Sequence, residues 1–266
     1  MSIDQAKQNA IKAEAAKVIK RRLKSFPDES TAIRNAPFHK EFLRPFRKKL
    51  SGVSTTDEQL IALASWLHGL NTSLGQSFFE KVAHILSDTQ KKSFSKPSIT
   101  RSQSSDITSI ISGLKNKTRE PSIEEENRLL FSNINGERVD AANFTADVYF
   151  ENDDSIYCIE LKSVRINSGE GKGEKEKMLR GKAHLKLMNP DKEVRFFVGL
   201  PFDPTADSAL EADKNRYFNY LVEFDKYFDP EEVLLGPELW SFLSGEDDGM
   251  LQVLDLISDA AQGIVD

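Results

Sequence analysis

Apolar residues recur at every third or fourth position over much of the chain up to residue 133, a spacing that predicts amphipathic helices. The first stretch stops at Phe26-Pro27-Asp28. Pro45 is expected to kink or split a later helix, and Gly69 to end another that begins with a threonine cap. The predicted helices of this half cover residues 3–25, 38–50, 55–70, 74–86, 105–115 and 121–133.

The spacing changes after Gly136. Residues 144–150 and 155–162 alternate and are rich in valine, isoleucine, tyrosine and phenylalanine, which predicts two strands joined by a hairpin turn. A nearly continuous apolar run at residues 193–200 predicts a strand covered on both faces. Helices are predicted over residues 173–188, 213–226, 237–243 and 249–261. This order predicts an α/β fold with a mixed central sheet flanked by helices.

Two carboxylates and a lysine fall on the strands of this hairpin. Because side chains alternate along a strand, Glu160 and Lys162 point the same way. The shared face of the preceding strand is expected to hold Thr145, Asp147 and Tyr149. With Glu151 paired to Ile156 across the turn, Asp147 falls opposite Glu160, at a Cβ separation of roughly 4.5–5.5 Å. Carboxylates this close repel each other, and a hard divalent cation neutralises them well.

The lysine beside this pair points to phosphodiester hydrolysis, where it can steer water or stabilise developing charge. The alternative is that Glu160 and Lys162 form an exposed ion pair on an edge strand. Apolar residues occupy both faces of residues 156–161, however, and charges at the end of a buried strand are costly unless they serve a site.

Asp147, twelve intervening residues and Glu160-Leu161-Lys162 resemble the PD-(D/E)xK motif of a nuclease superfamily. Ala146 replaces the usual proline, a common departure that does not touch the chemistry. The resemblance implies a restriction-endonuclease-like core in which Asp147 and Glu160 ligate Mg²⁺ and Lys162 assists the attacking water. Many such nucleases carry another glutamate on a helix ahead of the sheet, and Glu80 lies in such a segment, with an ordinary solvated glutamate as the alternative.

Residues 163–175 are rich in glycine but do not form a Walker A loop, since the glycine spacing is wrong and no Lys-Ser/Thr pair follows. The stretch resembles the segment of type II restriction endonucleases in which Asn-x-Gly-Glu leads into a basic helix. The resemblance implies an enzyme that cuts double-stranded DNA at a short specific site, with a cognate DNA methyltransferase as a functional partner. A homodimer is expected because a symmetric site needs two cuts.

The resemblance to this group covers about residues 70–245, and the helical ends look like subfamilies that cut short, interrupted GC-rich palindromes such as GGNCC. We therefore expect a helical N-terminal region, a PD-(D/E)xK nuclease core and a C-terminal helix. Their expected bounds are residues 1–70, 71–245 and 246–266.

The charge pattern supports a polyanionic partner although the net charge is −6. Residues 7–49 hold 13 Lys and Arg against 4 Asp and Glu, and residues 203–266 hold 3 against 16. Such segregation suits DNA, with solvated charge runs as the alternative. The basic, serine-rich residues 91–101 are expected to be a connector. The candidate DNA-binding residues are Arg165, Asn167, Lys172, Lys175, Arg101, Gln103 and Arg180.

Composition excludes several other classes. No apolar run approaches the ~18 residues of a membrane span, and the polar N-terminus is unlike a signal peptide, so a cytoplasmic protein is expected. The single cysteine excludes a disulfide framework, and the four scattered histidines form no recognisable cluster. The alternatives to a restriction enzyme are a DNA repair or junction-resolving nuclease of the same fold and a catalytically inactive DNA-binding module.

Overall fold

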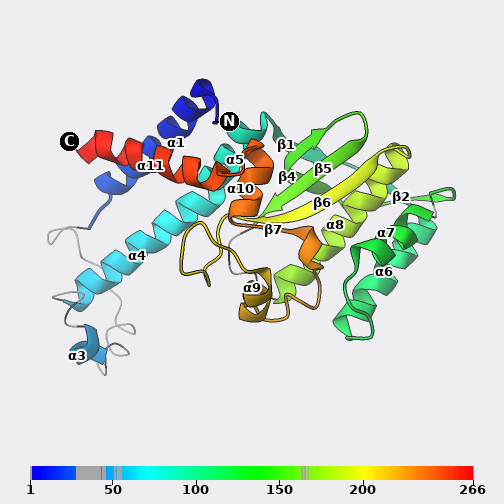
Figure 1. Cartoon of the computed structure of the whole chain (residues 1–266). Helices are drawn as coiled ribbons and strands as arrows, with labels where there is room; N and C mark the ends of the chain where they lie inside the picture. The colour runs from blue at the N-terminus through cyan, green and yellow to red at the C-terminus, as the bar shows by residue number, and fades with distance from the viewer. Residues whose placement is uncertain are drawn as a thin grey trace.

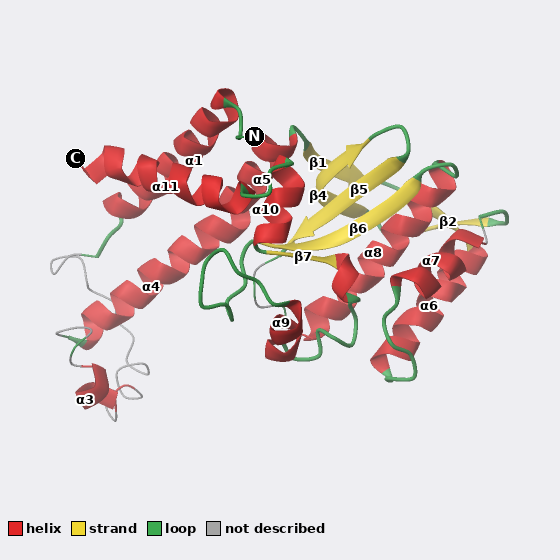
Figure 2. Ribbon diagram, viewed as in Figure 1, coloured by secondary structure: helices red, strands yellow, loops and turns green. Residues whose placement is uncertain are grey.

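The computed structural model describes residues 2–27, 43, 46–50, 52, 56–132, 134–162, 164, 166 and 168–265. Within these residues a five-stranded sheet lies between two groups of helices, as Figure 1 and Figure 2 show. The predicted α/β fold with a mixed central sheet is therefore confirmed.

The central sheet has the strand order β1-β4-β5-β6-β7. Its strands are β1 (Gln90–Phe94), β4 (Phe144–Glu151), β5 (Ser155–Leu161), β6 (Glu193–Leu200) and β7 (Val233–Leu235). β4 is antiparallel to β1 and β5, whereas β6 is parallel to β5 and β7. A small separate sheet pairs β2 (Ser98–Thr100) with β3 (Arg138–Asp140).

One face of the central sheet is covered by α8 (Ser168–Met188), which carries the chain from β5 to β6 as a parallel crossover requires. Outside α8 pack α6 (Arg101–Lys115) and α7 (Ile123–Ser132) (Figure 1). The helix lies close to the sheet because Gly181 has no side chain: a Cβ there would come within 2.7 Å of the Phe196 ring.

The opposite face is covered by α5 (Phe79–Ser87) and α10 (Pro237–Ser244), which share a core with Val148 and Ile159 of the sheet. Next to them α1 (Gln5–Lys24) and α11 (Gly249–Val265), near opposite ends of the chain, pack side by side (Figure 1). In the described part of the chain, no helix combines the length and apolar character needed to cross a membrane.

A continuous helical stretch precedes the sheet. The predicted stop at Gly69 is wrong, because α4 (Asp57–Ser73) runs through a π-helical segment, η2 (Leu74–Phe78), directly into α5. The expected threonine cap is present: Thr56 accepts a hydrogen bond from the backbone N–H of Gln59 at 3.1 Å.

Four short strands were not predicted: β1, β2, β3 and β7. β1 and β2 lie in the expected connector, and β1 is an edge strand whose lysines hide the apolar alternation. β7 is too short for its alternation to show.

Several predicted helices have different bounds: α6 begins at Arg101 instead of residue 105, and α11 ends at Val265 instead of residue 261. α8 begins at Ser168, so the expected glycine-rich loop is largely helical. The predicted helix 213–226 shortens to α9 (Lys214–Tyr220), because Leu221 becomes extended and the following apolar residues turn into the core, before the short 3-10 helix η3 (Pro230–Glu232). The prediction for residues 38–50 lies mostly outside the described residues, which include α3 (Arg47–Leu50).

Candidate active site

β4 carries a bulge beside Asp147. Ala146 and Tyr149 of β4 pair with Lys92 and Gln90 of β1. Two residues separate the pair on β4, but only Lys91 separates it on β1. The extra residue switches the faces: Ala146 and Tyr149 pack on the α8 side, whereas Val148 packs in the core on the opposite side. Bulges of this kind redirect side chains and are frequent at active sites.

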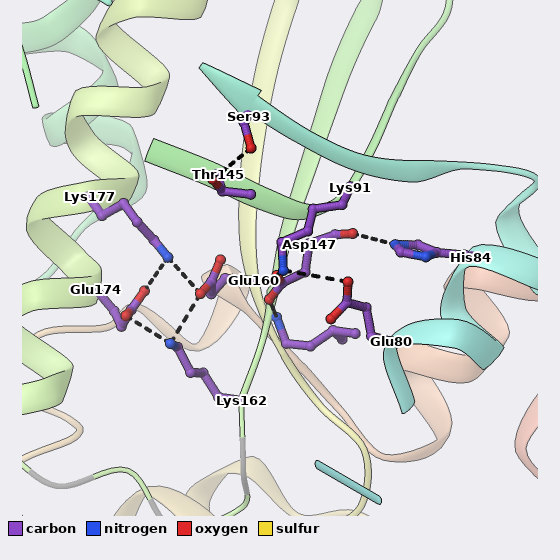
Figure 3. Close-up of polar contacts among 11 residues, drawn as sticks. Glu80, His84, Lys91, Ser93, Thr145, Asp147, Glu160, Lys162, Glu174 and Lys177 are labelled. Carbon is purple, nitrogen blue, oxygen red and sulfur yellow. Dashed lines mark hydrogen bonds and ion pairs between the residues drawn. The ribbon is translucent and has the colours of Figure 1, made fainter. Parts of the chain in front are cut away.

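The bulge overturns one prediction. Thr145, Asp147 and Tyr149 do not share one face, because the alternation on which that expectation depended is interrupted. Thr145 instead reaches the edge strand, where its hydroxyl lies 3.1 Å from that of Ser93 (Figure 3).

Asp147 lies just beyond the end of the β4–β5 ladder. The predicted pairing of Glu151 with Ile156 is confirmed, and the ladder stops one pair short of Asp147. There the Asp147 Oδ2 accepts a hydrogen bond from the backbone N–H of Leu161 at 3.0 Å. Nε2 of His84 on α5 lies 2.6 Å from the backbone oxygen of Asp147. The position of the carboxylate is thus fixed from both neighbouring elements.

Glu160 leaves β5 on the face covered by α8, and its side chain is 9% exposed. Its Oε1 is contacted by Lys177 at 2.6 Å and Lys162 at 3.1 Å, whereas its Oε2 is buried with no hydrogen-bond partner among the described residues. Burial and the nearby charge of Asp147 raise the pKa of Glu160, and the two lysines oppose that rise. A buried carboxylate oxygen without a donor is costly unless a cation compensates it.

Lys162 lies within reach of two carboxylates. Its Nζ is 2.8 Å from Glu174 of α8 and 3.1 Å from Glu160, which confirms that Glu160 and Lys162 point the same way (Figure 3). Burial alone would lower the pKa of Lys162, but Glu174 and Glu160 outweigh burial and raise it. Lys162 therefore stays protonated beside the two carboxylates.

Glu80 approaches the same place from α5. Nζ of Lys91 lies 2.9 Å from Oδ1 of Asp147 and 3.5 Å from Oε1 of Glu80, so one lysine links the two carboxylates (Figure 3). The hydrogen bond to Asp147 raises the pKa of Lys91 although burial opposes the rise. The structure thus brings together the four predicted catalytic residues Asp147, Glu160, Lys162 and Glu80.

The side chains present fit a hard divalent cation bound in part by water and substrate. Across the described ranges there is no group of three or more His, Cys, Asp or Glu side chains arranged to hold a metal. Mg²⁺ is often bound through only one or two carboxylates, with water and substrate phosphates completing its shell. Asp147 and Glu160 supply two carboxylates, and the unpartnered Oε2 of Glu160 is the oxygen such an ion would satisfy.

Two candidate DNA contacts turn out to be internal. Lys175 is fully buried, with its Nζ 2.6 Å from Glu126 and 2.5 Å from Glu232. Gln103 is also fully buried, where it completes the capping box at the start of α6 and donates to the carbonyl of Leu130 at 2.8 Å. Their assignment as DNA contacts is wrong, because both side chains are buried and make their polar contacts inside the protein.

The other candidates differ in their surroundings. Arg101 is exposed and bound by two hydrogen bonds of 2.8 Å to Glu137, whereas Arg180 pairs with Glu176 one helical turn away on α8. Lys172 is partly exposed near the start of α8. Arg165 and Asn167 lie outside the described residues.

The sequence interpretation missed three charged residues of the site: Lys91, Glu174 and Lys177. Lys91 was hidden in the expected connector. Glu174 and Lys177 are three residues apart on α8, and that spacing would have placed them on one face of the predicted helix, beside the motif strand.

Comparisons with known proteins identify the family of this chain. The family model of the type II restriction endonuclease HinfI matches residues 3–261. The type II restriction enzyme MjaII of Methanocaldococcus jannaschii is 46% identical over 258 residues, which are 95% of this chain and 70% of that enzyme. These matches favour restriction over a repair or junction-resolving role. The chain belongs to the HinfI family of type II restriction endonucleases, enzymes that hydrolyse DNA at specific sites.

Proposed function

We propose that this restriction endonuclease depends on Mg²⁺ held by Asp147 and Glu160. The observation that carries the proposal is the buried Oε2 of Glu160, which lacks a hydrogen-bond partner in the described part of the chain and lies near the charge of Asp147. In such a setting a divalent cation offsets both desolvation and repulsion between the carboxylates. When bound, Mg²⁺ supplies a Lewis acid that polarises the scissile phosphodiester and lowers the pKa of the attacking water.

The protein's own groups orient the reactants. Lys162 has three N–H donors, and the carboxylates of Glu160 and Glu174 engage two of them, which leaves one for a water molecule or a phosphate oxygen. Glu80 is proposed to hold Lys91 against Asp147 or to orient a second ion beside it. These roles make Asp147, Glu160 and Lys162 catalytic residues and Glu80 a supporting one.

The DNA duplex is proposed to approach the site along α8 and the end of β5. Arg165 and Asn167 follow the catalytic strand in the sequence, where an arginine and an asparagine can read guanine and adenine. Lys172 and Arg180 on α8 are proposed backbone contacts, as is Arg101 once it leaves Glu137. Arg165→Ala is therefore expected to change which sites are cut, which cleavage of singly substituted duplexes would measure.

The substrate is proposed to be double-stranded DNA with a short, interrupted GC-rich palindrome, on the strength of the family resemblance. A symmetric site favours a homodimer, in which each protomer cuts one strand. We also propose that the enzyme acts in the cytoplasm, together with a methyltransferase that modifies the same sequence.

Digestion of plasmid DNA in Mg²⁺ tests the proposal. Discrete fragments whose mapped ends share one palindrome are expected. A smear would mean cleavage without sequence preference, and binding without cutting would mean an inactive module. Fragments formed equally well in a metal chelator would contradict the Mg²⁺ dependence.

A further inference from the structure

Four charged side chains close a ring beside the motif strand (Figure 3). Glu160 and Lys162 come from the end of the strand, and Glu174 and Lys177 come from α8. Around the ring, Lys162 lies 3.1 Å from Glu160 and 2.8 Å from Glu174, and Lys177 lies 2.8 Å from Glu174 and 2.6 Å from Glu160. Negative and positive groups thus alternate, and each one contacts both neighbours.

The ring is shielded from water, so its ion pairs are stronger than those on a surface. The four side chains are between 9% and 23% exposed. Burial alone would raise the pKa of Glu174, but hydrogen bonds from Lys162 and Lys177 outweigh it and lower the pKa. Glu174 therefore remains ionised and available to both lysines.

The two oxygens of Glu160 are used differently. Both lysines contact Oε1, and Oε2 is the oxygen without a hydrogen-bond partner among the described residues. Glu174 draws the same two lysines from the other side. Without Glu174, two ammonium groups would face Glu160 alone and would compete with any other cation for its carboxylate.

We propose that Glu174 is a positioning residue, which holds Lys162 and Lys177 on Oε1 of Glu160 and so leaves Oε2 for the metal ion. The inference rests on the proposed Mg²⁺-dependent function. Glu174 touches neither the metal nor the DNA. It acts through the orientation of Glu160 and Lys162, and a small misplacement of catalytic groups lowers rates on the order of 100-fold.

The test compares Glu174→Gln, which keeps the size and removes the charge, with Glu174→Asp, which keeps the charge and shortens the side chain. Glu193→Gln is the matched control, since Glu193 pairs with Arg195 near the other end of the parallel strands. Two quantities are measured on the full chain: the single-turnover cleavage rate in Mg²⁺ and the Ca²⁺ affinity by titration calorimetry.

Glu174→Gln should lower the cleavage rate between about 10-fold and 100-fold and weaken Ca²⁺ binding about 10-fold. DNA affinity without divalent ions should stay within about 2-fold of wild type, as should all values for Glu193→Gln. Glu174→Asp should retain more activity than Glu174→Gln. The reverse order would show that Glu174 acts through packing and would overturn the inference.

Lys177→Gln removes another member of the same ring, so it provides a second test if the Glu174 variants do not fold. The double variant Glu174→Gln/Lys177→Gln should cleave DNA only slightly more slowly than the slower of the two single variants, because both changes break the same ring of ion pairs. Additive losses would overturn the inference, and so would a wild-type rate for folded Glu174→Gln. If the wild-type enzyme itself neither cuts DNA nor binds Ca²⁺, the proposed function fails first.

Discussion

At the residue scale, the negative charges of the site are balanced by a small number of lysines. Asp147 lies in the middle of β4, just beyond its last pair with β5, Glu160 lies near the end of β5, and each carboxylate is contacted by lysines. The lysines come from three separate elements, namely Lys91 from β1, Lys162 after β5 and Lys177 from α8. In the proposed function, the lysines that neutralise the carboxylates would also be the groups that meet a phosphate.

Lys162→Met tests the proposed role of this lysine. Methionine keeps most of the side-chain length and removes the N–H donors, so the cleavage rate should fall on the order of 100-fold or more. Thermal unfolding checks that the variant is folded, and single-turnover kinetics measures the loss. A rate near that of wild type would leave the two carboxylates without a catalytic partner.

The residue scale also shows what the sequence could and could not predict. The position of the hairpin turn was enough to predict the strand register, since Glu151 does pair with Ile156. The bulge at Asp147 could not be predicted, because it depends on pairing with β1, whose lysines conceal an edge strand. The buried Lys175 was taken for a DNA contact, since local sequence does not reveal a distant carboxylate such as Glu232.

At the element scale, α8 links the site to the core. Its charged face carries Glu174 and Lys177, and its apolar face packs against the sheet. The helix was predicted from its periodicity, but its start was placed late because glycines were interpreted as a loop. Gly181 is the residue that permits close contact with the sheet.

Gly181→Ala should therefore destabilise the protein by about 1–3 kcal/mol, because the new methyl group would crowd the rings of Phe196 and Phe144. Gly173→Ala on the same helix is the control. A Cβ there meets nothing within 4 Å, so the change should stabilise the helix by roughly 0.5–1 kcal/mol. Urea unfolding measures both. Equal effects of the two substitutions would refute the proposed close packing of α8.

At the scale of the whole molecule, buried charges join segments far apart in the sequence. Lys175 and Lys182 of α8 meet Glu126 of α7 and Glu232 of η3 in a cluster closed to solvent. Burial would raise the pKa of Glu232, but the two lysines lower it to about 2. Glu232 therefore stabilises the fold above its unfolded pKa of ~4.3, and this contribution is lost as the pH falls toward about 2.

Lys175→Met should destabilise the protein by about 3–5 kcal/mol at pH 7, because it leaves Glu126 and Glu232 facing each other without their shared cation. Their pKa values then rise in the folded variant. A carboxyl group with a raised pKa in the folded state stabilises that state at low pH, and this contribution is lost as the pH rises. The difference in unfolding free energy between wild type and Lys175→Met should therefore shrink from pH 7 to pH 5.

Lys186→Met is the control for this variant, since Lys186 donates to the carbonyl of Lys192 at 2.9 Å. Loss of this hydrogen bond should destabilise the protein by about 1 kcal/mol, and this loss of stability should not vary with pH. Urea unfolding at both pH values measures the two variants. A deficit for Lys175→Met that stays constant between pH 7 and pH 5 would contradict the account of the cluster.

The most direct test of the Mg²⁺ site is plasmid cleavage by Asp147→Asn and Glu160→Gln over a range of Mg²⁺ concentrations, with Asp153→Asn in the exposed hairpin turn as the control. Both variants should fold and bind DNA without metal at least as tightly as wild type, because each removes a negative charge that would face a phosphate. They should release no fragments at any Mg²⁺ concentration, while wild type and Asp153→Asn give the same discrete bands. Wild-type fragments and rates from a folded Glu160→Gln or Asp147→Asn variant would contradict the assignment of these two carboxylates as the metal site.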